Sequence, residues 1–137
     1  MIYNVDSELE TREIAEKFAK KLKAGDVVLL NGDLGAGKTT FTRFVLQSRG
    51  VKDIVNSPTF SILKTYQGDV EFHHFDTYRI SADEAIEAGF DEVLDDRDSI
   101  IFIEWSENIA PLLPDKYITV NIRRTGEESR EIEIINE

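Results

Sequence analysis

The loop GDLGAGKTT, residues 32–40, constrains the fold of this chain more than any other part of its sequence. It matches the pattern G-x-x-x-x-G-K-[ST]. An apolar run, DVVLLN at 26–31, precedes it, and a segment with Phe41, Phe44 and Val45 at helical spacing follows it. A buried strand, such a loop and a helix N-terminus together direct successive backbone N–H groups at one point, which makes an anion site. The alternative is a glycine turn with only a structural role.

The loop pattern assigns a role to each of its residues. Lys38 would reach the β- and γ-phosphates of a nucleotide, and Thr39 would offer its hydroxyl group to Mg²⁺. The glycines would allow the turn and the close approach of backbone to phosphate. The expected nucleotide contacts in the loop are Gly32, Asp33, Leu34, Gly35, Ala36, Gly37, Lys38, Thr39 and Thr40.

The rest of the sequence predicts a single α/β domain over residues 1–137. Two capping boxes, Ser7 to Glu10 and Ser81 to Glu84, mark helix starts. The first helix is expected over 7–22 with Gly25 ending it, and the loop's helix over 38–49. The expected strands are 26–31, 59–66, 70–76, 99–105, 117–124 and 130–136. Turns at QGD and TGEES predict two hairpins. We therefore expect a P-loop NTPase-like fold, a mixed sheet with a parallel centre and antiparallel additions.

Two carboxylates directly follow apolar strands, Glu104 after SIIFI and Asp76 after VEFHHF. A carboxylate in that position is costly unless it has a partner or a function. At the carboxyl end of a buried strand, either residue could hold Mg²⁺ directly or through water, or orient the attacking water. The expected catalytic residues are Lys38, Glu104 and Asp76, and the expected metal ligands are Thr39, Glu104 and Asp76. A strand-end salt bridge is the alternative for each acid.

Other polar residues allow two interpretations each. Ser57 and Thr59, in the segment NSPTF, could close over the γ-phosphate or simply form a turn before a strand. Arg79 could stabilise the negative charge of the phosphate groups as an arginine finger, or it could pair with a nearby acid.

The single Trp and the two His residues are less informative. Trp105 follows Glu104, and it either packs at the rim or contacts a partner or nucleotide. His73 and His74 are interpreted as strand residues, since the chain has no cysteine and no third zinc ligand is apparent.

The charge distribution bears on the choice of partners. The formal net charge is −11, which disfavours direct binding to a nucleic-acid backbone. Residues 1–64 hold 10 bases and 8 acids, whereas residues 65–137 hold 6 bases and 19 acids. Eight acids and one base lie between Asp83 and Asp98. This acidic stretch is either a solvated face or a docking surface for a basic partner.

Compartment signals are absent from the sequence. No apolar run reaches the roughly 18 residues of a membrane span. The first ten residues lack the basic and apolar blocks of a signal peptide. We therefore expect a cytoplasmic protein that does not contact a membrane.

Four motifs, GDLGAGKTTF, SPTF, HFDTYR and IEWSE, occur in this order. At these distances they closely resemble the bacterial TsaE family, formerly called YjeE. The resemblance covers about residues 7–135, although the C-terminal hairpin matches only in general pattern. That family consists of small P-loop ATPases needed for threonylcarbamoylation of adenosine 37, the t6A modification, in tRNAs that read codons starting with A.

The resemblance implies roles for the site residues. Lys38 and Thr39 would act on ATP and Mg²⁺ as described above. Glu104 would be a Mg²⁺ ligand or catalytic acid with Asp76 beside it. Residues 57–59 would form a switch-like segment, and Trp105 would be a functional contact next to the site.

The resemblance also implies partners. Family members resemble a motor or reset module that docks on the TsaB–TsaD pair, where the modification is made. Hydrolysis would be slow alone and regulated by docking. The chain would then contact tRNA mainly through these partners rather than directly, which agrees with its acidic composition.

Two rival functions are a small-molecule kinase and a nucleotide-gated binding module without significant catalysis. A kinase must cover the phosphates and seat an acceptor, and no lid or second-substrate region is obvious. The guanine signature [NT]-K-x-D is absent, so ATP is preferred mainly by resemblance. The base is expected near Thr11 of the first helix and Arg130 of the last hairpin.

Overall fold

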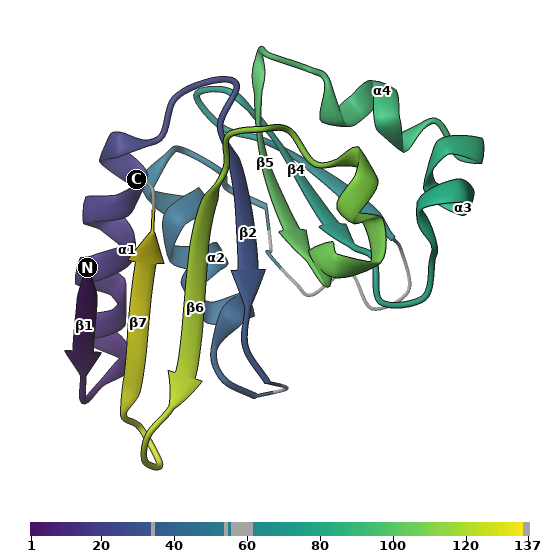
Figure 1. The fold of residues 1–137 in the computed structure, drawn as a ribbon. Coiled ribbons are helices and arrows are strands. Elements are labelled where there is room, and N and C mark those ends of the chain that lie inside the picture. The colour runs from purple at the N-terminus through teal and green to yellow at the C-terminus, as the bar shows by residue number, and fades with distance from the viewer. Residues whose placement is uncertain (34, 54, 56–61, 136–137) are drawn as a thin grey trace.

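The computed structural model describes residues 1–33, 35–53, 55 and 62–135. Within these residues, seven strands form one sheet in the order β1-β7-β6-β2-β5-β4-β3 (Figure 1). The strands are β1 (Ile2–Val5), β2 (Val27–Asn31), β3 (Leu63–Gln67), β4 (Glu71–Asp76), β5 (Ser99–Glu104), β6 (Ile118–Arg124) and β7 (Arg130–Ile135). The helices are α1 (Glu8–Lys21), α2 (Lys38–Ser48), α3 (Ala82–Glu87), α4 (Phe90–Leu94) and the 3₁₀ helix η1 (Ser106–Leu112).

The centre of the sheet is parallel. β2 pairs in parallel with both β5 and β6, and β4 pairs in parallel with β5. The additions are antiparallel: β3 on β4, β7 on β6, and β1 on β7. The structure therefore confirms the mixed sheet with a parallel centre that the sequence predicts.

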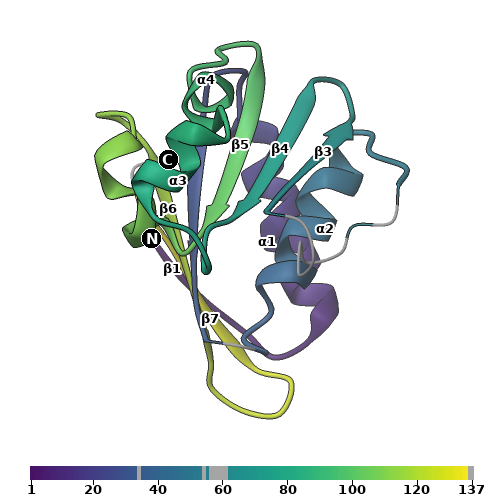
Figure 2. The ribbon, with the colours of Figure 1, turned by 90° about the vertical axis from the view of Figure 1, so that its right-hand side faces the viewer.

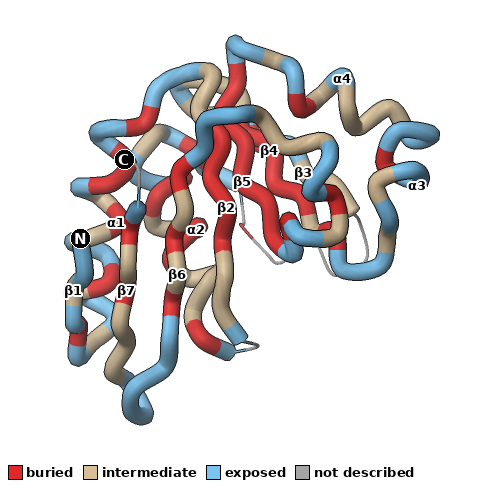
Figure 3. Tube along the Cα trace, in the orientation of Figure 1, coloured by how far each residue is buried: buried red, intermediate tan, exposed pale blue. Residues whose placement is uncertain are grey.

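Helices cover the sheet on both sides, and this explains why the central strands are apolar throughout. Figure 2 shows α1 and α2 on one face and α3 and α4 on the other. The larger core lies under α1 and α2 and includes Phe18, Phe41 and Phe102, all almost completely buried. A smaller core under α3, α4 and η1 includes Phe75 and Ile103. Buried residues accordingly concentrate in the central strands (Figure 3).

Most elements form where the sequence predicts them. The Ser7 hydroxyl accepts from the Glu10 N–H at the start of α1, and Ser81 with Glu84 forms a complete capping box. One helix end differs from the prediction. α1 ends at Lys21 with Leu22 as an extended cap, so Gly25 lies in the following turn.

Two elements of the structure, a strand and a helix, are not predicted from the sequence. The edge strand β1 is short and largely exposed, and it becomes a strand by antiparallel pairing with β7. Helix α4 is a single turn of five residues that follows Gly89 in the left-handed conformation. Neither has enough periodic apolar residues to be seen without its tertiary neighbours.

The predicted strand 59–66 begins at Leu63 in the structure, and residues 59–61 lie outside the described residues. In the described part of the chain, no helix has the length and apolar character that crossing a membrane requires.

One arginine ties the helical layer to the outer hairpin. Nη1 of Arg49 donates to the carbonyl oxygens of Ala19 at 2.7 Å and Leu22 at 2.8 Å, at the end of α1. Its Nε donates to Oδ2 of Asp69, in the β3–β4 turn, at 2.7 Å. A cation at the C-terminus of a helix satisfies carbonyl groups that have no partner within the helix.

We expect Arg49→Met to lower the free energy of unfolding by about 1–3 kcal/mol, because hydrogen bonds from a charged donor to the α1 carbonyls are lost. Urea unfolding followed by circular dichroism would measure this. Arg123→Met is the matched control. The Arg123 side chain is 68% exposed in its pair with Glu131, so the loss there is expected to stay within about 0.5 kcal/mol. Equal losses in both variants would contradict the role assigned to Arg49.

Candidate functional site

The loop between β2 and α2 presents a helix N-terminus with its amide groups uncapped. Gly37, at the N-cap of α2, has a φ of 107°, a left-handed conformation that disfavours side chains. Among the described residues, no side chain caps the first N–H groups of this helix. Gly32 is required for a different reason, since a Cβ there would lie 2.5 Å from the carbonyl oxygen of Ile122. The local geometry thus leaves an anion site at the start of α2.

A buried carboxylate lies directly beside the loop lysine. Glu104, at the end of β5, is only 4% exposed. Its Oε1 lies 3.4 Å from Nζ of Lys38, and its Oε2 lies 2.7 Å from Nε2 of His74 on β4. Since the carboxylate accepts, Nε2 of His74 carries the proton of this contact. Nδ1 of His74 is buried and has no hydrogen-bond partner among the described residues.

Opposing effects act on the pKa of Glu104, and the net pKa is lowered. Burial is the largest single effect and acts to raise the pKa. The effects that lower the pKa together exceed the effect of burial. They include the hydrogen bond from His74, the charge of His74 and the charge of Lys38. Glu104 therefore remains an ionised carboxylate at neutral pH in spite of its burial.

Asp76 lies next to Glu104 because β4 and β5 are parallel and these two residues are register partners. The Asp76 Oδ1 accepts from the N–H of Tyr78 at 3.1 Å, which orients the carboxylate at the strand end. Two acids and one lysine thus meet at the carboxyl edge of the sheet, where ligands bind in open α/β sheets.

The chain turns sharply after Glu104. Trp105 has a φ of 60°, the only non-glycine residue with positive φ in the described part of the chain. The buried hydroxyl group of Thr77 donates to the carbonyl oxygen of Glu104 at 3.0 Å and to that of Trp105 at 2.6 Å. Strained backbone of this kind persists only where its surroundings hold it, and it is common at functional sites.

This turn exposes a pair of aromatic rings beside the site. Trp105 is 41% exposed and Tyr78 is 60% exposed, and their ring centroids lie 4.9 Å apart. Nζ of Lys38 lies 5.7 Å from the Trp105 ring centroid. The rings therefore form an apolar rim next to the lysine and the acids.

A surface hollow with a volume of about 500 Å³ borders the loop. It is lined by Thr11 of α1, by Gly37 and Thr40, and by Arg130 of β7, among others. Arg130 Nε also donates to the carbonyl oxygen of Ala36 at 2.9 Å and so holds the loop. Thr11 and Arg130 thus line the same hollow beside the loop, and their contact with a base stays a prediction.

Not all the residues singled out by the sequence are placed together. Leu34, Ser57 and Thr59 lie outside the described residues. Arg79 is exposed in the turn after β4, and Asp33 is exposed in the loop. Thr39 lies in the first turn of α2.

His74 and Thr77 contribute contacts that the sequence reasoning missed. His74 was predicted only as a strand residue. Its spacing of two from Asp76, on the same face of β4, is the one signal that could have indicated its role. The contacts of Thr77 to the turn after β5 have no comparable signal in the sequence.

Comparisons with known proteins agree on one family. A sequence model described as "Threonylcarbamoyl adenosine biosynthesis protein TsaE" matches residues 5–132. The tRNA threonylcarbamoyladenosine biosynthesis protein TsaE of Bacillus subtilis (strain 168) is 43% identical over 124 residues, which cover 90% of this chain and 77% of that protein. The protein of the same name from Rickettsia typhi (strain ATCC VR-144 / Wilmington) is 44% identical over 125 residues, covering 89% and 85%.

A solved structure extends this similarity to the fold. The crystal structure of Bacillus subtilis YdiB aligns with a TM-score of 0.82 and 33% sequence identity, covering 100% of this chain and 86% of that one. The similarity therefore spans the whole sheet and its helices.

The lowered pKa of Glu104 predicts a pH dependence of stability. The stabilising contribution is fully present above the unfolded pKa of about 4.5 and is lost as pH falls through the lower folded pKa. As the pH falls through that acidic range, we expect the unfolding free energy of wild type to decrease relative to that of Glu104→Gln, because Gln does not titrate. Urea unfolding at a series of pH values would measure it. A difference that stays constant down to the most acidic pH at which the protein folds would contradict the assignment.

Proposed function

Because this chain belongs to the TsaE family, whose members take part in t6A biosynthesis in tRNA, we propose that it binds and slowly hydrolyses ATP in that machinery. In this proposal hydrolysis serves a partner complex of TsaB and TsaD proteins. The observation that carries the proposal is one contact. Lys38, the first residue of α2, lies beside the ionised Glu104 at the end of β5. A phosphate-binding lysine and an acid of this kind are the two recurring parts of a P-loop ATPase.

The chain's own residues divide the work in the proposed reaction. The α2 amides and Lys38 bind the phosphate oxygens and stabilise the charge that develops on them. Glu104 keeps a lowered pKa, so it accepts hydrogen bonds well and takes up protons poorly at neutral pH. We therefore assign Glu104 to orienting water or a metal-bound water, with His74 holding its second oxygen.

The donor set at the loop fits Mg²⁺. Thr39, Asp76 and Glu104 offer a hydroxyl group and two carboxylates, the hard oxygen ligands that Mg²⁺ prefers. Asp76 and Glu104 are neighbours in register, and Thr39 is on the first turn of the helix. Bound Mg²⁺ would neutralise charge on the phosphate oxygens. Asp76 and Glu104 would hold it directly or through water.

We assign the adenine base to the hollow between α1 and β7. Thr11 and Arg130 line it, and it borders Gly37 of the loop. A concave site with a few polar groups beside a phosphate loop is suited to a nucleoside.

The partner complex is proposed to dock beside the site, on the exposed rings of Tyr78 and Trp105. Aromatic residues are enriched at protein interfaces, where they supply much of the binding energy. Docking there would act on the turn that follows Glu104. The strongly negative net charge favours contact with tRNA through the partners.

We expect Lys38→Ala and Glu104→Ala to lower the rate of ATP hydrolysis about 10²-fold or more, because each removes a charged group at the reacting phosphate. Phosphate release would be measured with and without the TsaB and TsaD proteins. Lys20→Ala, on the exposed face of α1, is the matched control and is expected to keep the wild-type rate. If Glu104→Ala supported t6A formation as well as wild type, the chain would be a binding module and the proposed ATPase role would fail. Phosphate appearing on an acceptor instead of in solution would indicate a kinase.

We expect Tyr78→Ser to reduce the stimulation of hydrolysis by the partner complex about tenfold, because an exposed aromatic anchor of the interface is lost. The measured quantity is the ratio of the rates with and without partners. Tyr117→Ser is the control, since Tyr117 is a half-exposed aromatic residue that precedes β6 and lies outside the aromatic pair. The docking surface is wrongly placed if both variants retain the wild-type ratio.

A further inference from the structure

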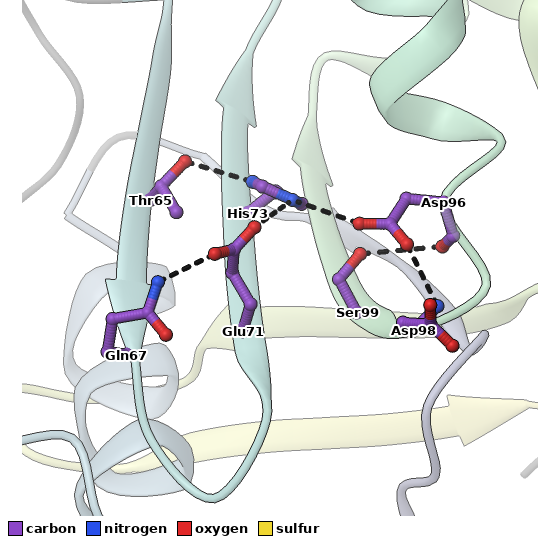
Figure 4. Close-up of polar contacts among 7 residues, drawn as sticks. All are labelled: Thr65, Gln67, Glu71, His73, Asp96, Asp98 and Ser99. Carbon is purple, nitrogen blue, oxygen red and sulfur yellow. Dashed lines mark hydrogen bonds and ion pairs between the residues drawn. The ribbon is translucent and has the colours of Figure 1, made fainter.

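A second cluster of metal-ligating side chains lies at the opposite end of the sheet from the nucleotide loop. Glu71 and His73 are on β4, and Asp96 is in the turn before β5 (Figure 4). Glu71 begins β4 and Asp76 ends it, so the strand separates the two sites by about 16 Å. The cluster is therefore distinct from the phosphate site.

The cluster converges on one atom of a buried ring. His73 is 7% exposed, and its Nε2 lies 3.1 Å from Oε1 of Glu71 and 3.7 Å from Oδ2 of Asp96. The three ligand atoms all lie within 4.8 Å of one another. The two carboxylates bring negative charge to one ring nitrogen, and a shared cation would relieve their repulsion.

Each of the three groups is also oriented from its far side. Nδ1 of His73 lies 2.9 Å from the hydroxyl oxygen of Thr65. Oε2 of Glu71 accepts from the Gln67 side-chain amide at 2.6 Å. Oδ1 of Asp96 accepts from the N–H of Asp98 at 2.9 Å.

These outer bonds leave Nε2, Oε1 and Oδ2 free to face a common point, as Figure 4 shows. Outer hydrogen bonds that hold the non-ligating atom of each ligand are the usual second layer of a metal site. Thr65 fits this role, because its hydroxyl group can accept the proton of Nδ1 when Nε2 coordinates a cation.

We propose that Glu71, His73 and Asp96 bind a divalent transition-metal ion of the zinc class. Ligands at about 2.0–2.2 Å from a tetrahedral zinc ion lie roughly 3.4 Å apart, and the two observed separations from Nε2 bracket that value. The imidazole nitrogen favours such an ion over Mg²⁺ or Ca²⁺, which prefer all-oxygen sites. The side chains of Glu71 and Asp96 are 41% and 35% exposed, which gives an ion access from solvent.

The bound ion connects two segments of the chain through their side chains. It ties β4 of the β3–β4 hairpin to the α4–β5 turn, and the same strand ends at Asp76 in the nucleotide site. It also gives one member of the acidic stretch 83–98 a specific role, as an ion ligand. The competing interpretation is a protonated His73 that pairs with both carboxylates and binds no metal.

Zinc binding to the untagged full chain tests this inference, with Zn²⁺ titrated against a chromophoric chelator in excess Mg²⁺ and without nucleotide. Wild type is expected to bind one equivalent. His73→Gln and Asp96→Asn are expected to weaken binding at least 10- to 100-fold. Glu92→Gln, an exposed acid of α4 in the same acidic stretch, is the matched control and is expected to bind as wild type does.

The inference is overturned if wild type takes up no Zn²⁺, which is the outcome for a protonated His73, or if both ligand variants bind as tightly as wild type. Asp96→Asn preserves side-chain shape at a partly exposed position, so it decides the question if His73→Gln fails to fold. Melting temperature gives a second readout. Zn²⁺ is expected to raise it in wild type and Glu92→Gln but not in Asp96→Asn. The test uses no nucleotide and stands apart from the proposed ATPase function.

Discussion

The arrangement of the candidate site depends on one buried contact, the Glu104 carboxylate held between Lys38 and His74. An ionised carboxylate without partners is expensive to bury, and removal of one partner leaves an uncompensated charge. The surrounding structure holds both partners in place. β2 delivers the loop with Lys38, β4 delivers His74, and parallel pairing of both strands with β5 aligns them with Glu104. The same pairing sets Asp76 beside Glu104.

The two ends of the sheet carry different chemistry. At the carboxyl ends of the parallel strands, a helix N-terminus and a lysine supply positive charge next to two acids. At the amino ends, Glu71 and Asp96 converge on the ring of His73. Strand β4 runs between both ends, so an ion at one end and a nucleotide at the other would act on the same hairpin.

Much of the fold follows from local sequence. The apolar runs of β2 and β5, the Ser-Glu caps and the turns at QGD and TGEES each depend on neighbours in the chain, and the structure forms them where predicted. The misses have a common cause. β1 has little pattern of its own and exists through pairing with β7, and α4 is one turn defined by Gly89 and by packing of Leu94. The base contacts expected from Thr11 and Arg130 stay a prediction, and the structure places both residues at one hollow.

The sequence by itself determined the loop, its strand and helix, and two acids at strand ends, because backbone geometry and apolar periodicity are properties of short segments. Only the tertiary structure decided which groups the acids meet. His74 reaches Glu104 from a neighbouring strand, Thr77 holds the turn at Trp105, and Asp96 joins His73 across 23 positions of the sequence. Those contacts depend on strand order and register, which place distant residues within a few ångströms and are invisible to any local pattern.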